Sequence, residues 1–179
     1  AARFGKPFLL NPAPAVPLPA ALLSGTTLLT PNEHELALVL HNAPDAWQDV
    51  LASHPQRILM TRGSDGAWFA DPCGKLHHQP TFPVSAIDTT GAGDTFNGAL
   101  AADWGKGLAQ LTRLACAASA LSVTRKGAQS GMPTRAELNA FLAIYFFCQY
   151  IAFIFYCQAL RNCKDDYSIA YCDFNFYMI

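Results

Sequence analysis

Ser85-Ala-Ile-Asp-Thr-Thr-Gly-Ala-Gly-Asp-Thr-Phe-Asn-Gly-Ala99 contains two glycines that allow a tight turn, followed by small and apolar residues at helical spacing. We therefore predict a strand or loop, a turn at Gly91 and Gly93, and a helix over residues 95–102. The first amides of a helix lack acceptors within it and carry a partial positive charge that attracts anions. The glycines would let a phosphate approach the amides of residues 92–94.

Asp94 lies beside this predicted anion site. A carboxylate next to an anion is electrostatically costly, and its obvious chemical use is to accept a proton from a hydroxyl that attacks a phosphoryl group. Gly91-Ala-Gly-Asp94 alone also fits a plain helix start with an acidic side chain in its first turn. A dinucleotide-binding fingerprint would need a third glycine where Phe96 stands, and the chain has no Gly-Lys-Ser/Thr of a Walker loop.

The longer run Asp88-Thr-Thr-Gly-Ala-Gly-Asp-Thr-Phe-Asn-Gly98 closely resembles the C-terminal signature of the ribokinase (PfkB-type) sugar kinase family. The resemblance implies an α/β, three-layer α/β/α fold, of which this chain has room for the C-terminal part. It also implies ATP-dependent phosphoryl transfer to a hydroxyl of a ribose-like sugar, with Asp94 as general base and sugar contact. The family's phosphoryl group and nucleotide would be held by the backbone of Gly91, Ala92, Gly93 and Asp94.

A second segment with family-like residues begins at Pro31. Its pattern predicts a helix capped by Asn32, with Glu33 and Glu35 in the first turn, and capping alone explains those residues. Asn32 and Glu35 also match the Asn-x-x-Glu motif of the family, which implies that they organise water bound to Mg²⁺ beside the nucleotide. Mg²⁺ keeps several of its waters, so one carboxylate and one amide suffice.

Thr61-Arg-Gly-Ser-Asp-Gly66 joins two predicted strands, and a hairpin turn that uses both glycines explains it locally. In the family a Thr-x-Gly-x-x-Gly loop at this place lines the nucleotide. The resemblance therefore implies ATP contacts from Thr61, Arg62, Gly63, Ser64, Asp65 and Gly66. A long helix is predicted over 107–124, and the family resemblance places Cys116 near the adenine.

The resemblance further implies a monovalent cation site, such as one for K⁺, next to the anion site. Asp88 and Thr90 would contribute to it from the signature. Backbone carbonyls after the long helix would complete it, at positions that match Ser122, Arg125, Gly127 and Gly131. The family usually carries a serine at the position of Gly131.

Short apolar runs at 6–11, 26–30 and 57–61 alternate with helical patterns. This alternation predicts a mostly parallel sheet between helices. The first run ends at Asn11, a candidate for the ligand-binding rim at the carboxyl ends of the strands. An Asx turn before the following proline explains Asn11 equally well.

The chain of 179 residues has 12 basic and 13 acidic side chains, so we expect no nucleic-acid partner. Its six cysteines follow no disulfide or metal spacing, which favours free thiols in a cytoplasmic protein. The sequence begins at Ala1 with no signal segment, as expected of a chain that starts within a domain. Full-length members of the family also have a sugar-binding half with a small β lid, and they can form homodimers. We expect this half to lie outside the given sequence.

We assign residues 1–142 to the kinase part and residues 143–179 to an aromatic and cysteine-rich extension outside the family pattern. The segment 138–160 contains no charged residue and is long enough to span a bilayer. Polar residues at Asn139, Gln149 and Gln158 interrupt it, so we expect an extension without membrane association, with a membrane-tethered module as an alternative. A further alternative is a nucleotide-binding remnant without catalytic activity.

Overall fold

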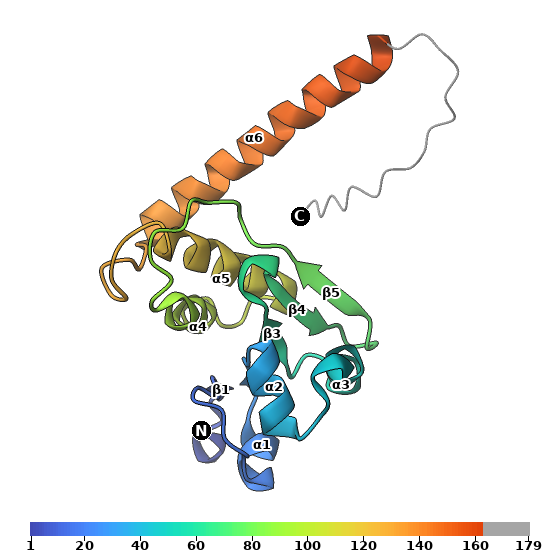
Figure 1. Ribbon diagram of the computed structural model, residues 1–179, viewed down its shortest axis with the longest axis vertical. Coiled ribbons are helices and arrows are strands. Elements are labelled where there is room, and N and C mark those ends of the chain that lie inside the picture. The colour runs from blue at the N-terminus through green and yellow to red at the C-terminus, as the bar shows by residue number, and fades with distance from the viewer. Residues whose placement is uncertain (163–179) are drawn as a thin grey trace. The chain divides into compact units, whose positions relative to one another are not determined.

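The computed structural model describes residues 1–162 (Figure 1). The chain divides into two compact units, residues 1–141 and residues 142–179. The predicted extension 143–179 therefore lies partly outside the described residues, and Cys163 and Cys172 belong to that part.

The first unit contains five short strands in two sheets, β1-β2 and β3-β4-β5, which isolated bridges connect. Their bounds are β1 Leu9–Leu10, β2 Leu28–Leu29, β3 Leu59–Thr61, β4 Ala67–Ala70 and β5 Leu76–Gln79. β1 and β2 are parallel, and parallel bridges from Leu29 to Ile58 and from Asn32 to Thr61 join β2 to β3. β4 and β5 continue as antiparallel neighbours.

Six α-helices accompany the strands in the part of the chain that the structure describes. They are α1 Ala20–Gly25, α2 Glu33–Leu40, α3 Trp47–Ser53, α4 Ala92–Ala102, α5 Leu108–Ser122 and α6 Arg135–Asn162. Short 3₁₀ turns occur at Ala2–Phe4, Pro44–Ala46 and Gly63–Asp65. α4 begins three residues before the helix expected over 95–102, because Gly91 turns the chain and the next residue is already helical.

The two faces of the sheet are covered by different helices. Met60 pairs with Trp68 across β3 and β4, and Trp68 packs against Trp47 of α3 with ring centroids 5.2 Å apart. Successive strand residues point to opposite faces, so Leu59 and Phe69 face the other side, where α5 contacts β5. The predicted three-layer α/β arrangement is confirmed. The prediction of a mostly parallel sheet is wrong for this part of the fold, because β3, β4 and β5 are joined by short connections and pair antiparallel.

The core between the sheet and the helices α2 and α3 explains why these segments fold as they do. Its fully buried members come from β2, β3, α2 and α3, together with the residue before β3. They are Leu29, Leu36, Val39, Val50, Leu51, Ile58 and Met60. Each apolar residue buried in this way contributes roughly 1.5–3 kcal/mol.

The predicted helix cap at Asn32 is present, and a second capping box lies at Thr134. Asn32 Oδ1 accepts a hydrogen bond from the Glu35 amide at 2.8 Å, and Glu35 Oε2 accepts one from the Asn32 amide at 2.8 Å. At the start of α6, Glu137 Oε2 accepts a hydrogen bond from the Thr134 amide at 2.7 Å. The helix α1 is preceded by prolines, of which Pro19 occupies its N-cap position.

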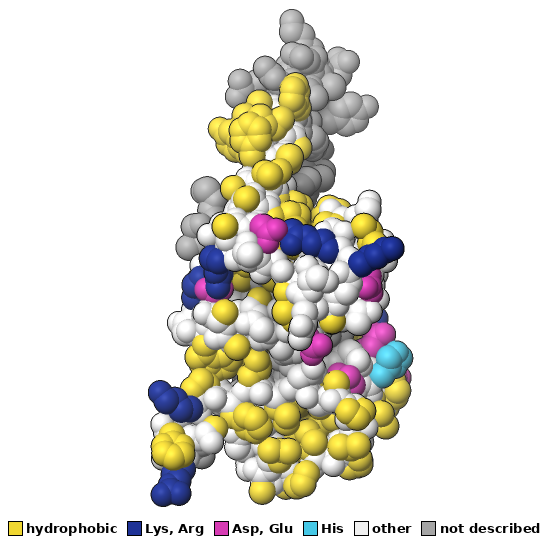
Figure 2. All heavy atoms as spheres, turned by 90° about the vertical axis from the view of Figure 1, so that its left-hand side faces the viewer, with side chains coloured by type: hydrophobic (Ala, Val, Ile, Leu, Met, Phe, Trp, Pro, Cys, Tyr) yellow, Lys and Arg dark blue, Asp and Glu magenta, His cyan; other side chains and the backbone are white. Residues whose placement is uncertain are grey.

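Of the second unit, the structure describes the part of α6 that follows Phe141. Over Arg135–Phe155 the helix is long and apolar enough to cross a membrane, judged by length and composition, and 6 % of its most apolar window is buried. Hydrophobic side chains gather along it (Figure 2). The large exposed ones are Ile144, Phe146, Phe147, Tyr150, Ile151, Phe153, Ile154 and Phe155.

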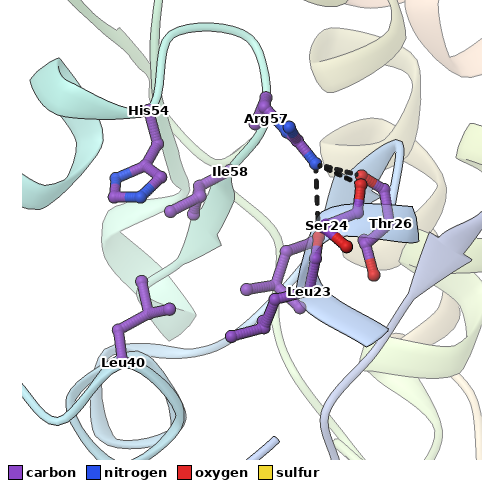
Figure 3. Close-up of a pocket in the computed structure, with 8 residues that line it drawn as sticks. Leu23, Ser24, Thr26, Leu40, His54, Arg57 and Ile58 are labelled. Atoms are coloured by element: carbon purple, nitrogen blue, oxygen red, sulfur yellow. Dashed lines mark hydrogen bonds between the residues drawn. The ribbon is translucent and has the colours of Figure 1, made fainter. Parts of the chain in front are cut away.

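A pocket of about 220 Å³ lies at the amino ends of β2 and β3 (Figure 3). It is lined by Leu23, Ser24, Thr26, Leu29, Leu40, His54, Arg57 and Ile58. Arg57 Nη2 donates to the carbonyls of Leu23, Ser24 and Thr26 at 3.2, 3.3 and 2.7 Å. The guanidinium thus satisfies carbonyls at the end of α1 and beside it, where the helix dipole favours a cation.

Arg57→Met is expected to lower the free energy of unfolding by about 1–2 kcal/mol, because three carbonyls lose a charged donor. Thermal and urea unfolding of the full chain measure the change. Lys75→Met removes an exposed cation for which no ion pair is found within the described residues, and it serves as the control. Equal stability of the two variants would contradict a structural role of Arg57.

Candidate functional site

The start of α4 depends on Gly91. Its φ of 76° lies in the left-handed region, and a Cβ there would come within 2.8 Å of the Ala128 Cβ and 2.9 Å of the Ala128 Cα. Both the dihedral angle and the close approach of Ala128 therefore require glycine. No side chain caps this helix end.

Two amides at this end have no hydrogen-bond acceptor among the described residues, those of Gly93 and Asp94. The Ala92 amide donates to the Thr89 carbonyl at 3.2 Å, and the Thr95 amide donates to the Gly91 carbonyl at 2.9 Å. A Cβ on Gly93 would meet nothing within 4 Å. The free amides thus face open space, as an anion site at a helix start requires.

The Asp94 carboxylate lies on the exposed side of the same helix start. Within residues 1–162 the structure shows no ion pair or hydrogen bond of this carboxylate. The side chain is therefore accessible to a substrate hydroxyl, which a general base must be.

The carboxyl ends of the first strands meet α4 through two side chains. The Thr30 hydroxyl, at the end of β2, donates to Asn97 Oδ1 at 2.7 Å, and Asn97 Nδ2 donates to the Gly93 carbonyl at 2.9 Å. The Thr30 amide donates to the carbonyl of Leu10, the residue before Asn11. This edge of the sheet is where α/β proteins bind ligands.

The Asn32–Glu35 motif lies next to the Thr61 loop. Asn32 and Thr61 form a parallel bridge, and the Thr61 amide donates to the Pro31 carbonyl at 2.9 Å. The capping box uses Asn32 Oδ1 and Glu35 Oε2. Two side-chain atoms of the motif have no partner in the described part of the chain: Glu35 Oε1, which is an acceptor, and Asn32 Nδ2, which is a donor.

In the loop 61–66, two predicted nucleotide contacts have protein partners. Arg62 Nε donates to Glu33 Oε2 at 2.7 Å, and the Arg62 guanidinium carbon lies 5.3 Å from the centre of the Trp47 ring. Asp65 Oδ2 accepts a hydrogen bond from Trp68 Nε1 at 2.9 Å. These side chains brace the loop, in which Gly63 and Ser64 are exposed.

Gly66 closes this loop with a φ of 103°. A Cβ there would collide with the Gln79 carbonyl oxygen and would lie 2.7 Å from the Thr81 amide nitrogen. The glycine is required by the fold of the loop itself, whether or not a nucleotide is bound.

Asp88 ties the signature to the loop after α5. Its Oδ1 accepts a hydrogen bond from the Thr90 amide at 2.9 Å, and its Oδ2 accepts one from the Gly127 amide at 2.8 Å. A hydrogen bond from the Thr90 side chain, and then the Gly127 and Thr90 amides, lowers the pKa of Asp88 to about 2. The carboxylate is therefore ionised at neutral pH.

Carbonyl oxygens of the loop after α5 converge at Gly131. A Cβ on this buried glycine would lie 2.7 Å from the Gly127 oxygen, 2.8 Å from the Ser122 oxygen and 3.7 Å from the Arg125 oxygen. Three of the four predicted carbonyl positions, those of Ser122, Arg125 and Gly127, thus lie around the fourth, Gly131, in the loop whose Gly127 amide binds Asp88. Oxygens from backbone carbonyls are suitable ligands for a hard cation.

Asp88→Asn is expected to lower the melting temperature at pH 7, because an amide nitrogen replaces one of two acceptor oxygens. The folded-state pKa of Asp88, about 2, lies below the ordinary value of 3.8, so the ionised carboxylate stabilises the fold above pH 3.8. The stabilisation is lost as the pH falls towards 2. Melting temperatures of wild type and Asp88→Asn should therefore converge between about pH 4 and pH 2, and a constant difference would contradict the assignment.

Cys116 is buried in α5, and burial raises the pKa of its thiol to about 12. Its place near an adenine stays a prediction. Thr95 is also buried, and its Oγ1 is a buried side-chain oxygen without a partner in the described chain. A bound water or ligand would satisfy such a hydroxyl.

Sequence reasoning missed three side chains of this region: Thr30, Asn97 and Ser119. The spacing of Asn97 four residues after Gly93 is a signal, since residues at this spacing share a helix face. Thr30 and Ser119 come from other elements, and no local pattern marks them.

Comparison with solved structures identifies the fold as that of the ribokinases. The ribokinase of Thermotoga maritima superposes with a TM-score of 0.69 at 34% identity, over 79% of this chain and 50% of that chain. The Arabidopsis thaliana ribokinase, solved with ribose and ATP, gives a TM-score of 0.69 at 32% identity, over 78% of this chain and 48% of that one.

The sequence agrees with this fold. Residues 1–135 match the pfkB family carbohydrate kinases, and the chain belongs to that family. The Bacillus subtilis ribokinase is 41% identical over 139 residues, which are 76% of this chain and 46% of the relative. The Lactococcus lactis ribokinase is 40% identical over 134 residues, 74% of this chain and 44% of that protein. The chain thus spans about half the length of the curated relatives it matches.

Proposed function

We propose that this chain provides the nucleotide-binding and catalytic part of an ATP-dependent kinase that phosphorylates a hydroxyl of a ribose-like sugar. The observation that carries the proposal is the start of α4, where two free amides and the exposed Asp94 carboxylate lie on one turn. The ribokinase names of the relatives support the substrate class, and the Arabidopsis structure with ribose and ATP supports the pair of ligands.

In the proposed reaction a sugar hydroxyl oxygen forms a bond to the γ-phosphorus of ATP while the bond from that phosphorus to the bridging oxygen breaks. Asp94 accepts the hydroxyl proton, and ADP leaves with the electron pair of the broken bond. The Gly93 and Asp94 amides donate hydrogen bonds to the phosphoryl oxygens, which stabilises charge on the transferring group. Thr61, Gly63, Ser64 and Gly66 would line the nucleotide, with Arg62 and Asp65 bracing that loop.

The chain has residues that could bind the two metal ions of a ribokinase-like reaction, Mg²⁺ and a monovalent cation. Asn32 and Glu35 would hold Mg²⁺ through water, because Mg²⁺ retains its waters and the free Glu35 Oε1 can accept a hydrogen bond from one of them, while the Asn32 cap orients that carboxylate. The carbonyls of Ser122, Arg125 and Gly127 around Gly131, with Asp88 and Thr90 nearby, would hold a monovalent cation such as K⁺. Mg²⁺ supplies charge neutralisation of the phosphates when bound.

The test compares two measurements on the full chain, ATP binding by calorimetry with Mg²⁺ present and ribose-dependent release of ADP. Binding with turnover supports the kinase. Binding without turnover supports the second candidate, a nucleotide-binding segment without catalysis. Absence of both overturns the proposal.

The apolar stretch of α6 favours a membrane-tethered form of the same module as a competing arrangement. We propose a cytoplasmic protein instead, supported by the free thiols of Cys73, Cys116 and Cys148 and by ribokinase relatives that act on small molecules. Flotation of the full chain with phospholipid vesicles decides between them. Recovery of the chain in the vesicle fraction would contradict the cytoplasmic proposal.

A further inference from the structure

Each of the two free amides at the start of α4 belongs to a peptide unit whose carbonyl accepts a hydrogen bond from a side chain. A peptide unit is planar, so a bond that holds its carbonyl oxygen also sets the direction of its amide. The carbonyl of Ala92 shares a unit with the Gly93 amide. The carbonyl of Gly93 shares one with the Asp94 amide.

The first of these units is held from α5. Ser119 Oγ donates to the Ala92 carbonyl at 3.1 Å, across the interface between α4 and α5. The bond joins residues 27 positions apart in sequence. It therefore ties the direction of the Gly93 amide to the packing of a second helix.

The second unit is held from the sheet. Asn97 Nδ2 donates to the Gly93 carbonyl at 2.9 Å, and Asn97 Oδ1 accepts the Thr30 hydroxyl at 2.7 Å. A carbonyl only accepts, so the Asn97 nitrogen must face Gly93 and its oxygen must face Thr30. Thr30 is 3% exposed, and its amide is bonded to the Leu10 carbonyl, which makes it a rigid anchor.

We propose that Ser119, and Asn97 backed by Thr30, are positioning residues that aim the Gly93 and Asp94 amides at the phosphoryl group. The inference rests on the proposed function of this helix start. Donors held in place before the ligand arrives need no reorientation during binding, so they contribute more to affinity and to charge stabilisation. Ala92 and Gly93 are residues of α4, so the helix backbone sets the direction of both peptide units, and the two side-chain bonds hold them in it.

Ser119→Ala and Thr30→Val each remove one hydroxyl and test the two links separately. Matched controls are Thr112→Val and Thr26→Val, because their buried hydroxyls donate to the carbonyls of Leu108 and Leu22, away from the start of α4. Magnesium ATP titrated into the full chain should bind about threefold to tenfold more weakly to the first two variants, as the loss of one hydrogen bond predicts. The controls should bind as the wild type does, even where they lower the melting temperature equally.

Two further variants separate positioning from general damage. Ser119→Thr keeps the hydroxyl and should keep the affinity for magnesium ATP. Asn97→Ala combined with Thr30→Val should bind no more weakly than Asn97→Ala alone, since the two side chains act through one carbonyl. An additive loss would contradict the link from the sheet through Asn97.

A measurement without nucleotide distinguishes failure of this inference from failure of the proposed function. Backbone ¹⁵N relaxation of the free chain reports the order of the Gly93 and Asp94 amides. Ser119→Ala should loosen the Gly93 amide, and Thr30→Val should loosen the Asp94 amide, with neither control doing so. If the wild-type chain does not bind magnesium ATP, the proposed function fails, while the amide order still decides the positioning. Unchanged order in both test variants would overturn the inference.

Discussion

Asp94→Asn is expected to lower ribose-dependent ADP release by about 10²–10⁴-fold, the contribution typical of a general base. Asparagine keeps the shape of the side chain and loses the ability to take the hydroxyl proton. The affinity for magnesium ATP should be retained or should rise by up to about threefold, because a negative charge beside the phosphates is removed. Coupled ADP release and calorimetry measure the two quantities.

Asp45→Asn is the matched control, since it removes an exposed acidic side chain in the Pro44–Ala46 turn, outside the candidate site. It should change neither turnover nor ATP affinity. Turnover of Asp94→Asn within tenfold of the wild-type rate would refute the base assignment. A loss of ATP binding with the loss of turnover would instead give Asp94 a structural role.

Gly91→Ala and Gly93→Ala are expected to act in opposite directions on stability, although the two glycines are two residues apart. Gly91→Ala should cost about 2–5 kcal/mol, because alanine is strained at a φ of 76° and its Cβ would overlap Ala128. Gly93→Ala should stabilise the chain by about 0.5–1 kcal/mol, because alanine favours the helix and its Cβ meets nothing.

The same Gly93→Ala variant should bind magnesium ATP about tenfold or more weakly, because the Cβ of a helical residue tilts towards the helix start, where the phosphate would lie. Gly98→Ala is the control, since a Cβ there also meets nothing within 4 Å but stands farther along α4. It should stabilise the chain without loss of affinity. Equal ATP binding by both alanine variants would contradict the phosphate site.

Much of the fold was predictable because the signals are local. The cap at Asn32 follows from residues three apart in sequence, and the strand β4 from a short apolar run after a glycine turn. Strand alternation places His77 and His78 on opposite faces of β5, where they stack on Phe69 and Trp68. The family and its layers were recognised from a signature of consecutive residues.

The sequence predicts less well which residues of the loop 61–66 belong to the candidate site. The sequence suggests that Arg62 and Asp65 contact the nucleotide, whereas the structure shows their side chains bonded to Glu33 and Trp68. Whether they also touch ATP stays a prediction. The domain assignment 1–142 and 143–179 likewise stays a prediction, as do the roles of the site residues.

The sequence by itself determined where the chain turns and caps, because a dihedral angle or a bond over three or four residues depends on neighbours along the chain. The sequence indicated a turn at Gly91, a helix cap at Asn32 and, at Asp94, a carboxylate beside an anion site at a helix start. Only the tertiary structure decided that Thr30 and Ser119 reach the peptide units of that helix start, and that three carbonyls converge at Gly131. Such contacts join residues distant in sequence, and their geometry exists only once the helices have packed on the sheet.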